Sequence, residues 1–316
     1  MSYRGLVLDC LQVYESEFDA DNLVRRIGDL LATGRAGLVT DIDGTVAPIE
    51  ALPEQARVLP LAREALAGLR QYVDVVAVVT GRSALDGQRM VGVDGLTYIG
   101  NHGLEVLTNE GPQLHAETRP WIARIARALE AVRQHAQESG VIVEDKGATG
   151  SIHYRLATQP EHTRTRILEV LARDAVTSGL RVEEGRMVIN LLPPLTVTKG
   201  SAVTWLAREH NLERIVYFGD DVTDAHAFKA LRVLREKDAL LTLGVGVISR
   251  ETPPSVKQLA DASVPSVEAV ADVLQRVLGV LKTSDTMETK VPIVLGHTLD
   301  ERRSTHHGQR RAGNTA

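Results

Sequence analysis

The segment Asp41-Ile42-Asp43-Gly44-Thr45 places two carboxylates two positions apart, directly after the apolar run 37–39. Residues two apart in an extended chain point the same way, so both acids can face one pocket. Two converging carboxylates must share a proton or neutralise each other through a cation. The pattern favours a nucleophile beside an acid/base at a Mg2+ site. A solvated turn at a strand end is the alternative, because Asp and Gly are common turn residues.

A second polar segment, Thr80-Gly81-Arg82-Ser83, follows the apolar run 75–79. A hydroxyl group, a glycine amide and the start of a helix are together suited to holding an anion. The alternative is that Thr80 or Ser83 only caps that helix.

Lys199 begins a predicted helix after Thr198 and precedes Gly200. A cation at a helix N-terminus opposes the helix dipole, so a specific reason for this lysine is expected. Neutralising a phosphate is one such reason. An ordinary surface lysine, with its ammonium group reaching water, is the other interpretation.

Three acids follow the apolar run 215–218 in the segment Gly219-Asp220-Asp221-Val222-Thr223-Asp224. Some of them are expected to cap the next helix. Three acids within five residues exceed that need, and oxygen ligands at this density suit Mg2+. All four motifs lie at predicted strand ends, which is where ligands bind in open α/β sheets.

The composition is that of a soluble globular protein, with 43% hydrophobic and 24% charged residues among 316. A net charge of −5 argues against a nucleic-acid partner. Cys10 is the single cysteine, which excludes an internal disulfide and fits a cytoplasmic location. The sequence has no signal peptide pattern and no run long enough to span a membrane, so we expect no membrane association. It does not specify an oligomeric state.

Elements of two kinds must position the motifs. Strands at 37–40, 75–79, 97–99, 215–218 and 241–247 alternate with helices at 54–70, 199–210, from 223 onward and at 267–281. Apolar strands separated by helices predict an α/β fold with a doubly wound parallel sheet.

The region between the two parts of the predicted sheet has a different order of elements. It reads as helix 118–138, strands 141–144 and 151–155, helix 161–176, and strands 180–183 and 187–192. This order predicts an inserted α+β cap domain with two helices on one face of its sheet. We therefore predict an N-terminal helical extension (1–35), a discontinuous core (36–107 and 196–282), the cap (108–195) and a disordered tail (283–316).

The four motifs in this order resemble those of the haloacid dehalogenase-like phosphohydrolases, from about residue 37 to 281. Within that superfamily the chain resembles the trehalose-6-phosphate phosphatases. The segments that carry this closer resemblance are Val79-Thr80-Gly81-Arg82, Gly100-Asn101-His102-Gly103-Leu104-Glu105, Glu144-x-Lys146 through His153-Tyr154-Arg155, Thr198-Lys199-Gly200-Ser201-Ala202 and Gly219-Asp220-Asp221-x-Thr223-Asp224.

The resemblance implies phosphoryl transfer in two steps. Asp41 would attack the phosphate and form an aspartyl phosphate. Asp43 would protonate the leaving sugar oxygen and later deprotonate the attacking water. Thr80 and Lys199 would bind the transferring oxygens, where stabilisation of charge matters most.

The resemblance also implies a Mg2+ site and a sugar site. Mg2+ would be held by Asp41, the backbone carbonyl of Asp43 and Asp220, with Asp221 and Asp224 as further or water-mediated partners. For each sugar-binding candidate, an exposed strand or loop residue is the alternative, and His102 equally suits a structural role. The candidates that would contact the sugar are Arg82, Asn101, His102, Glu105, Glu144, Lys146, His153, Arg155 and Asn190.

One segment departs from the family pattern. Asn190 stands where the family usually carries a glutamate, and Leu192 where it carries an arginine. Asn lacks the carboxylate charge, and Leu cannot bind an anion. The expected activity is release of trehalose from trehalose 6-phosphate. The rivals are a phosphatase for another phosphorylated sugar or glycoside, and a non-catalytic phosphosugar-binding protein.

Overall fold

The computed structural model describes residues 18–136, 138–173, 179–249 and 252–288. Within them the chain forms an eight-stranded sheet and a separate four-stranded sheet. None of the helices in these ranges is long and apolar enough to cross a membrane.

The larger sheet has the order β12-β11-β10-β1-β2-β3-β4-β5, and its first six strands are parallel. The antiparallel hairpin of β4 and β5 extends it at one edge. Its strands are β1 (Ala36–Thr40), β2 (Val75–Val79), β3 (Thr97–Gly100), β4 (Glu105–Thr108), β5 (Gly111–Leu114), β10 (Arg214–Gly219), β11 (Leu241–Val247) and β12 (Ala262–Val264).

Helices cover both faces of this sheet. Successive residues of a strand face opposite sides, so Leu38 of β1 packs in one apolar cluster and Val39 in the other. The first face is covered by α1 (Ala20–Leu31), α2 (Pro60–Leu69), α3 (Ala84–Val91) and α9 (Val267–Glu288). The second face is covered by α6 (Lys199–Glu209), α7 (Val222–Lys237) and α8 (Pro254–Leu259). The predicted doubly wound core is confirmed.

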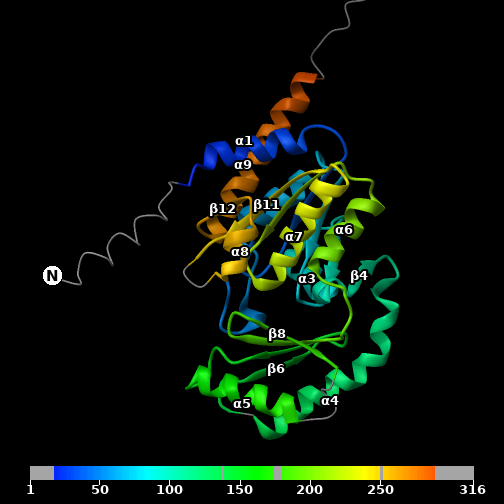
Figure 1. Cartoon of the computed structure of the whole chain (residues 1–316). Helices are drawn as coiled ribbons and strands as arrows, with labels where there is room; N and C mark the ends of the chain where they lie inside the picture. The colour runs from blue at the N-terminus through cyan, green and yellow to red at the C-terminus, as the bar shows by residue number, and fades with distance from the viewer. Residues whose placement is uncertain (1–17, 137, 174–178, 250–251, 289–316) are drawn as a thin grey trace, which may run out of the picture.

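The smaller sheet is antiparallel, in the order β6-β7-β9-β8. Two helices pack on one of its faces around Ile125, Leu129 and Ile167, and Figure 1 shows them on the side away from the core. The predicted α+β cap is confirmed. Its elements are α4 (Arg119–His135), β6 (Ile142–Asp145), β7 (Gly150–His153), α5 (Pro160–Arg173), β8 (Arg181–Gly185) and β9 (Val188–Leu192).

The structure corrects the sequence prediction in three of the segments that were assigned. The predicted helix 54–70 is a short 3-10 turn, Pro53–Gln55, followed by α2, because Pro60 fixes the start of a new helix and keeps Leu59 extended. Residues 108–114 were predicted to open the cap, yet Gly111–Leu114 pairs with β4 in the core sheet. Residues 283–288 were predicted to be disordered and are the end of α9, while the rest of the predicted tail lies outside the described residues.

Candidate active site

The first motif forms a turn at the carboxyl end of β1. The amide of Asp41 donates to the carbonyl of Phe218 at 3.0 Å, which joins this turn to the end of β10. Gly44 has φ +80°, and a Cβ there would lie 2.2 Å from Oδ2 of Asp220. Only glycine therefore allows the first and fourth motifs to approach this closely. The solvated-turn alternative is wrong for Asp41, which is 4% exposed.

Lys199 is held at the N-terminus of α6, where Thr198 and Ser201 form a reciprocal capping pair. Its side chain is 2% exposed, and its Nζ lies 3.0 Å from Oδ1 of Asp41 and 2.8 Å from Oδ1 of Asp224. Burial alone would lower the pKa of Lys199, but these two carboxylates outweigh it and raise that pKa. The surface-lysine interpretation is therefore wrong.

Asp41, Asp220 and Asp224 form a buried acidic cluster whose ligand atoms lie within 4.8 Å of one another. Burial raises the pKa of Asp41 to about 8, with further increases from Asp224 and Asp43, although Lys199 opposes the change. Burial and Asp224 raise the pKa of Asp220 in the same direction. Ionised together, the three carboxylates would carry more negative charge than Lys199 balances, so without a metal the cluster holds protons more tightly than exposed acids do. Hard oxygen donors in this arrangement fit a divalent cation such as Mg2+.

Asp224 differs from the other acids because its oxygens already have partners. Oδ1 accepts from Nζ of Lys199 at 2.8 Å and from the hydroxyl of Tyr217 at 2.5 Å. Oδ2 accepts from the amides of Asp220 at 3.1 Å and Asp221 at 3.0 Å. This geometry favours a role in positioning Lys199 and the motif loop over direct metal binding.

Asp221, the remaining predicted metal partner, lines the cavity described below. Its Oδ1 is buried without a hydrogen-bond partner among the described residues. Burial raises the pKa of this carboxyl group. It thus remains available for a water-mediated contact to a cation on Asp220.

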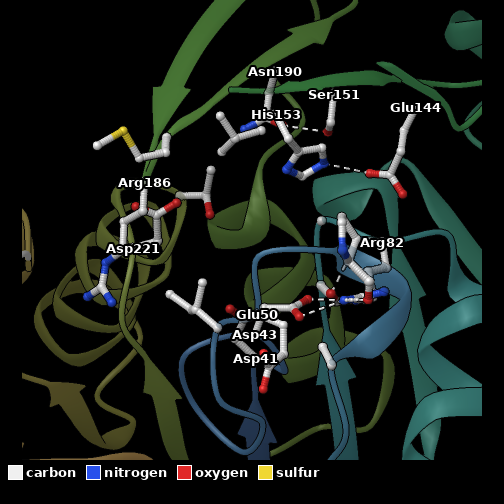
Figure 2. A pocket seen from close by; sticks show the side chains of 18 of the residues that line it. Asp41, Asp43, Glu50, Arg82, Glu144, Ser151, His153, Arg186, Asn190 and Asp221 are labelled. Carbon is white, nitrogen blue, oxygen red and sulfur yellow. Dashed lines mark hydrogen bonds and ion pairs between the residues drawn. The ribbon is translucent and has the colours of Figure 1, made fainter. Parts of the chain in front are cut away.

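Asp43 forms a two-point ion pair with Arg82. Nε of Arg82 lies 2.7 Å from Oδ2 of Asp43, and Nη2 lies 2.7 Å from Oδ1 (Figure 2). Nη2 also donates to the carbonyl of Pro53 at 2.9 Å. Arg82 was predicted to bind the sugar; it lines the cavity described below, and its guanidinium group contacts the predicted acid/base.

Thr80 lies at the carboxyl end of β2 and is 1% exposed. Its hydroxyl accepts from the amide of Arg82 at 3.2 Å. The cap of α3 is Ser83, whose hydroxyl accepts from the amide of Asp86. Thr80 is therefore not needed as a helix cap, and it lines the same cavity as Asp41 and Lys199.

The cavity lies between the core and the cap sheet. Figure 2 shows Asp41, Asp43 and Arg82 from the core on one side, with cap residues opposite them. Predicted sugar-binding residues in its wall are Arg82, His102, Glu144, Lys146, His153, Arg155 and Asn190.

Polar contacts link the cap residues in that wall. His153 Nε2 lies 2.8 Å from Oε2 of Glu144, and the Ser151 hydroxyl donates to Oδ1 of Asn190 at 2.7 Å (Figure 2). Lys146 donates to Ser151 at 2.8 Å and to the core carbonyl of Gly81 at 3.1 Å.

The charges in this wall shift two pKa values. Burial opposes ionisation of Glu144, but the His153 hydrogen bond and the charge of Lys146 overcome it and lower the pKa of Glu144 to about 2. Burial lowers the pKa of Lys146. The wall thus presents an ionised carboxylate beside a buried amine, which suits sugar hydroxyl groups as acceptor and donor.

Asn101 and Glu105 were predicted to bind the sugar but are not among the residues lining the cavity. Asn101 Nδ2 donates to Oε2 of Glu105 at 2.5 Å, and its Oδ1 accepts from the hydroxyl of Thr149 at 2.6 Å. Thr149 belongs to the turn between β6 and β7. The pair therefore fastens the end of β3 to the cap.

Arg186 was missed in the sequence. It lies in the turn between β8 and β9, with Nη1 3.2 Å from Oδ2 of Asp220. Its Nη2 donates to the Asp220 carbonyl at 3.2 Å and to the Thr252 hydroxyl at 3.0 Å. The sequence feature that could have identified it is a cation in the tight turn Gly185-Arg186-Met187. The strands on either side of this turn end above the fourth motif.

Leu192, which replaces the family's arginine, is fully buried and is not among the cavity-lining residues. Asn190, in contrast, is 5% exposed and lines the cavity. Of these two departures from the family pattern, only the one at Asn190 therefore alters the wall of the cavity.

Comparisons with known proteins agree on the family. The family model for trehalose-phosphatase matches residues 39–284. A trehalose-phosphate phosphatase of Mycobacterium avium is 35% identical over 228 residues, covering 68% of this chain and 56% of that protein. An uncharacterized glycosyl hydrolase of Mycobacterium tuberculosis is 32% identical over 253 residues, covering 77% of this chain and 17% of that protein. The chain thus spans about half, or less, of the length of these relatives.

Solved structures support the same fold. The C-terminal domain of Candida albicans trehalose-6-phosphate phosphatase aligns with a TM-score of 0.69 at 19% identity, over 83% of this chain and 97% of that one. A trehalose-6-phosphate phosphatase related protein aligns with a TM-score of 0.60 at 26% identity, over 78% and 99%. The chain belongs to the trehalose-phosphatase family and has its haloacid dehalogenase-like core and cap.

Proposed function

We propose that this chain is a Mg2+-dependent sugar-phosphate phosphatase that hydrolyses trehalose 6-phosphate to trehalose and phosphate. The observation that carries the proposal is the contact of Lys199 Nζ with Oδ1 of Asp41 at 3.0 Å, in a cavity that Asp43 also lines. A buried carboxylate beside a buried cation is suited to attack on a phosphate. The names and motifs of the related trehalose-phosphate phosphatases support the substrate.

In the first step Asp41 attacks the phosphorus, and the bond to the sugar oxygen breaks. The product on the protein is an aspartyl phosphate. Lys199 and the Thr80 hydroxyl stabilise the charge on the transferring oxygens. Bound Mg2+, held by Asp41 and Asp220 with the backbone carbonyl of Asp43, would supply the positive charge that offsets repulsion between carboxylate and phosphate.

Asp43 handles the protons in both steps. It gives a proton to the leaving sugar oxygen in the first step. In the second step it accepts a proton from the water that attacks the aspartyl phosphate, which breaks the bond between phosphorus and Asp41 and releases phosphate. Its two-point contact with Arg82 fixes the plane of the carboxyl group. Transfer therefore requires that this pair loosen when the substrate enters.

The cap wall binds the sugar. Glu144 offers acceptors, and Lys146 offers donors, to hydroxyl groups that lie beyond the phosphate. Asn190 offers a neutral amide where the family carries a carboxylate, and its Oδ1 is already bonded to Ser151. That contact favours a second candidate, a phosphatase for another phosphorylated sugar or glycoside.

A non-catalytic phosphosugar-binding protein would have no use for a nucleophile or an acid/base. Both Asp41 and Asp43 are present, and both line the cavity together with Lys199. Buried carboxylates that repel one another, such as Asp41 and Asp220, cost free energy, and such groups are concentrated at functional sites. This arrangement favours catalysis.

Phosphate release from a panel of sugar phosphates tests the proposal. We expect release that depends on Mg2+, is abolished by EDTA and is lost in Asp41→Asn. Binding of sugar phosphate without any release would overturn the enzyme assignment. Equal kcat/KM on glucose 6-phosphate and trehalose 6-phosphate would support the assignment as a sugar-phosphate phosphatase. It would overturn the assignment of trehalose 6-phosphate as the specific substrate.

A further inference from the structure

His102 occupies a constrained position at the end of β3. Asn101, His102 and Gly103 all have positive φ values, of 51°, 59° and 107°. The amide of His102 donates to the carbonyl of Thr80 at 3.0 Å. Left-handed backbone at two successive non-glycine residues costs free energy, and such strain is concentrated at functional sites.

The imidazole ring lies directly against Gly81. A Cβ on Gly81 would come within 2.6 Å of the ring Cε1 and 2.9 Å of Nε2. The glycine of the second motif is therefore needed to make room for this ring. Because the carbonyl of Gly81 binds Lys146, the ring lies where the phosphate end of the cavity meets the cap.

Neither ring nitrogen of His102 has a hydrogen-bond partner among the described residues, although the side chain is 6% exposed. A buried polar atom without a partner loses its hydrogen bond to water and gains none in return, which destabilises the folded protein. His102 also lines the cavity. The structural role considered from the sequence would require satisfied nitrogens, so it does not explain this residue.

The surroundings of the ring are cationic. Burial lowers the pKa of His102 well below its usual value, and the charges of Lys199, Lys146, Arg181 and His226 act in the same direction. The ring is therefore neutral, with one N–H donor and one acceptor nitrogen. The lysine ammonium groups on either side can only donate, so His102 supplies an acceptor that they lack.

We propose that His102 contacts the substrate where phosphate and sugar meet: one ring nitrogen accepts from the sugar hydroxyl nearest the phosphoester, which is the 4-hydroxyl of a pyranose 6-phosphate, and the other donates to a phosphate oxygen. This inference rests on the proposed function and narrows its substrate class. The site then selects phosphate monoesters of polyols and sugars that carry a hydroxyl within reach of the ring when the phosphate is bound, as the 4-hydroxyl of a sugar 6-phosphate is, over esters that lack one.

The test compares substrates with and without that hydroxyl. In His102→Phe the ring shape is kept and both hydrogen bonds are lost. We expect kcat/KM on trehalose 6-phosphate and glucose 6-phosphate to fall about 10- to 100-fold. This fall should exceed the fall on p-nitrophenyl phosphate by about threefold or more, because that substrate loses only the contact to its phosphate oxygen. His102→Gln, which keeps a donor and an acceptor, should recover part of the loss.

His135→Gln, on the exposed surface of α4, is the matched control and should leave the ratio between substrates unchanged. Thermal unfolding shows whether each variant folds, and the Gln variant decides the matter if the Phe variant does not. An equal loss on all substrates, or no loss, overturns the inference.

The proposed function can fail separately. If the unmodified chain releases phosphate from no substrate, the phosphatase assignment is wrong. Calorimetry then decides the role of His102 through the Kd of trehalose 6-phosphate for the unmodified chain and for His102→Phe. Binding weakened about tenfold or more supports the role, and an unchanged Kd or no binding to either overturns it.

Discussion

Nζ of Lys199 lies 3.0 Å from Oδ1 of Asp41, and the two side chains are 2% and 6% exposed. The lysine comes from the first turn of α6 and the aspartate from the end of β1, 158 positions earlier in the chain. Their contact joins the two halves of the discontinuous core at the proposed nucleophile. Removing either charge deprives the other of one buried partner of opposite sign.

Lys199→Met tests this contact. We expect kcat/KM to fall about 10³-fold or more, because the cation that stabilises the transferring oxygens is lost. The free energy of unfolding should fall by roughly 3–5 kcal/mol, since Asp41 and Asp224 lose their buried partner. Phosphate release and urea unfolding measure the two effects. Lys229→Met, at an exposed position of α7, is the control, and retention of activity within tenfold in Lys199→Met would contradict the assignment.

Arg82→Lys tests the two-point contact with Asp43. A lysine keeps the charge but cannot hold both carboxylate oxygens in one plane. We expect kcat to fall about tenfold with a smaller change in KM. The reason is that Arg82 orients the carboxyl group of Asp43, which acts in the chemical steps, and contributes less to substrate binding. Steady-state kinetics on trehalose 6-phosphate separate the two constants. If only KM rises, Arg82 is a substrate ligand, as the sequence predicted. Arg89→Lys, on the exposed side of α3, is the matched control.

The raised pKa of Asp41, about 8 against an ordinary value of 3.8, predicts how stability depends on pH. Between these values the folded protein holds a proton that the unfolded chain has released. The free energy of unfolding of the Mg2+-free protein should therefore fall as pH rises from about 4 to 8. Asp220, whose pKa is also raised, adds to this trend.

Mg2+ should oppose that loss because it favours the ionised carboxylates. We expect the increase in Tm caused by Mg2+ to be larger at pH 8 than at pH 5, with EDTA reversing it. Asp41→Asn removes one titrating group, so its Tm in EDTA should decline less steeply with pH. An increase in Tm that is the same at both pH values would argue against the acidic cluster as the metal site.

The sequence predicted the four strand-end motifs because each is a short run of special residues after an apolar strand. Asp41, Thr80, Lys199 and Asp220 therefore could be found without coordinates. The β4–β5 hairpin was missed, since its short strands lack the continuous apolar pattern of the parallel ones.

Contacts between segments that are distant in the chain could not be predicted from the sequence. Arg186 reaches Asp220 from the cap, and Arg82 forms an ion pair with Asp43. Neither partner can be read from spacing along the chain, because both depend on how the cap and the loop at Pro53 fold over the strand ends. The full occupancy of the Asp224 oxygens was likewise hidden, since it requires Tyr217 and two backbone amides.

Asn190→Glu tests how far the departure from the family pattern changes the sugar. Oδ1 of Asn190 accepts from Ser151, and the side chain lies at the cavity wall, away from Asp41. A carboxylate there can still accept from Ser151 and adds an acceptor for sugar hydroxyl groups. We expect KM for trehalose 6-phosphate to change severalfold, with kcat nearly unaffected, because the transferring phosphate does not touch this position. Asn190→Gln, which extends the side chain without adding charge, separates length from charge. A change in kcat alone would show that Asn190 does not take part in recognition of the sugar.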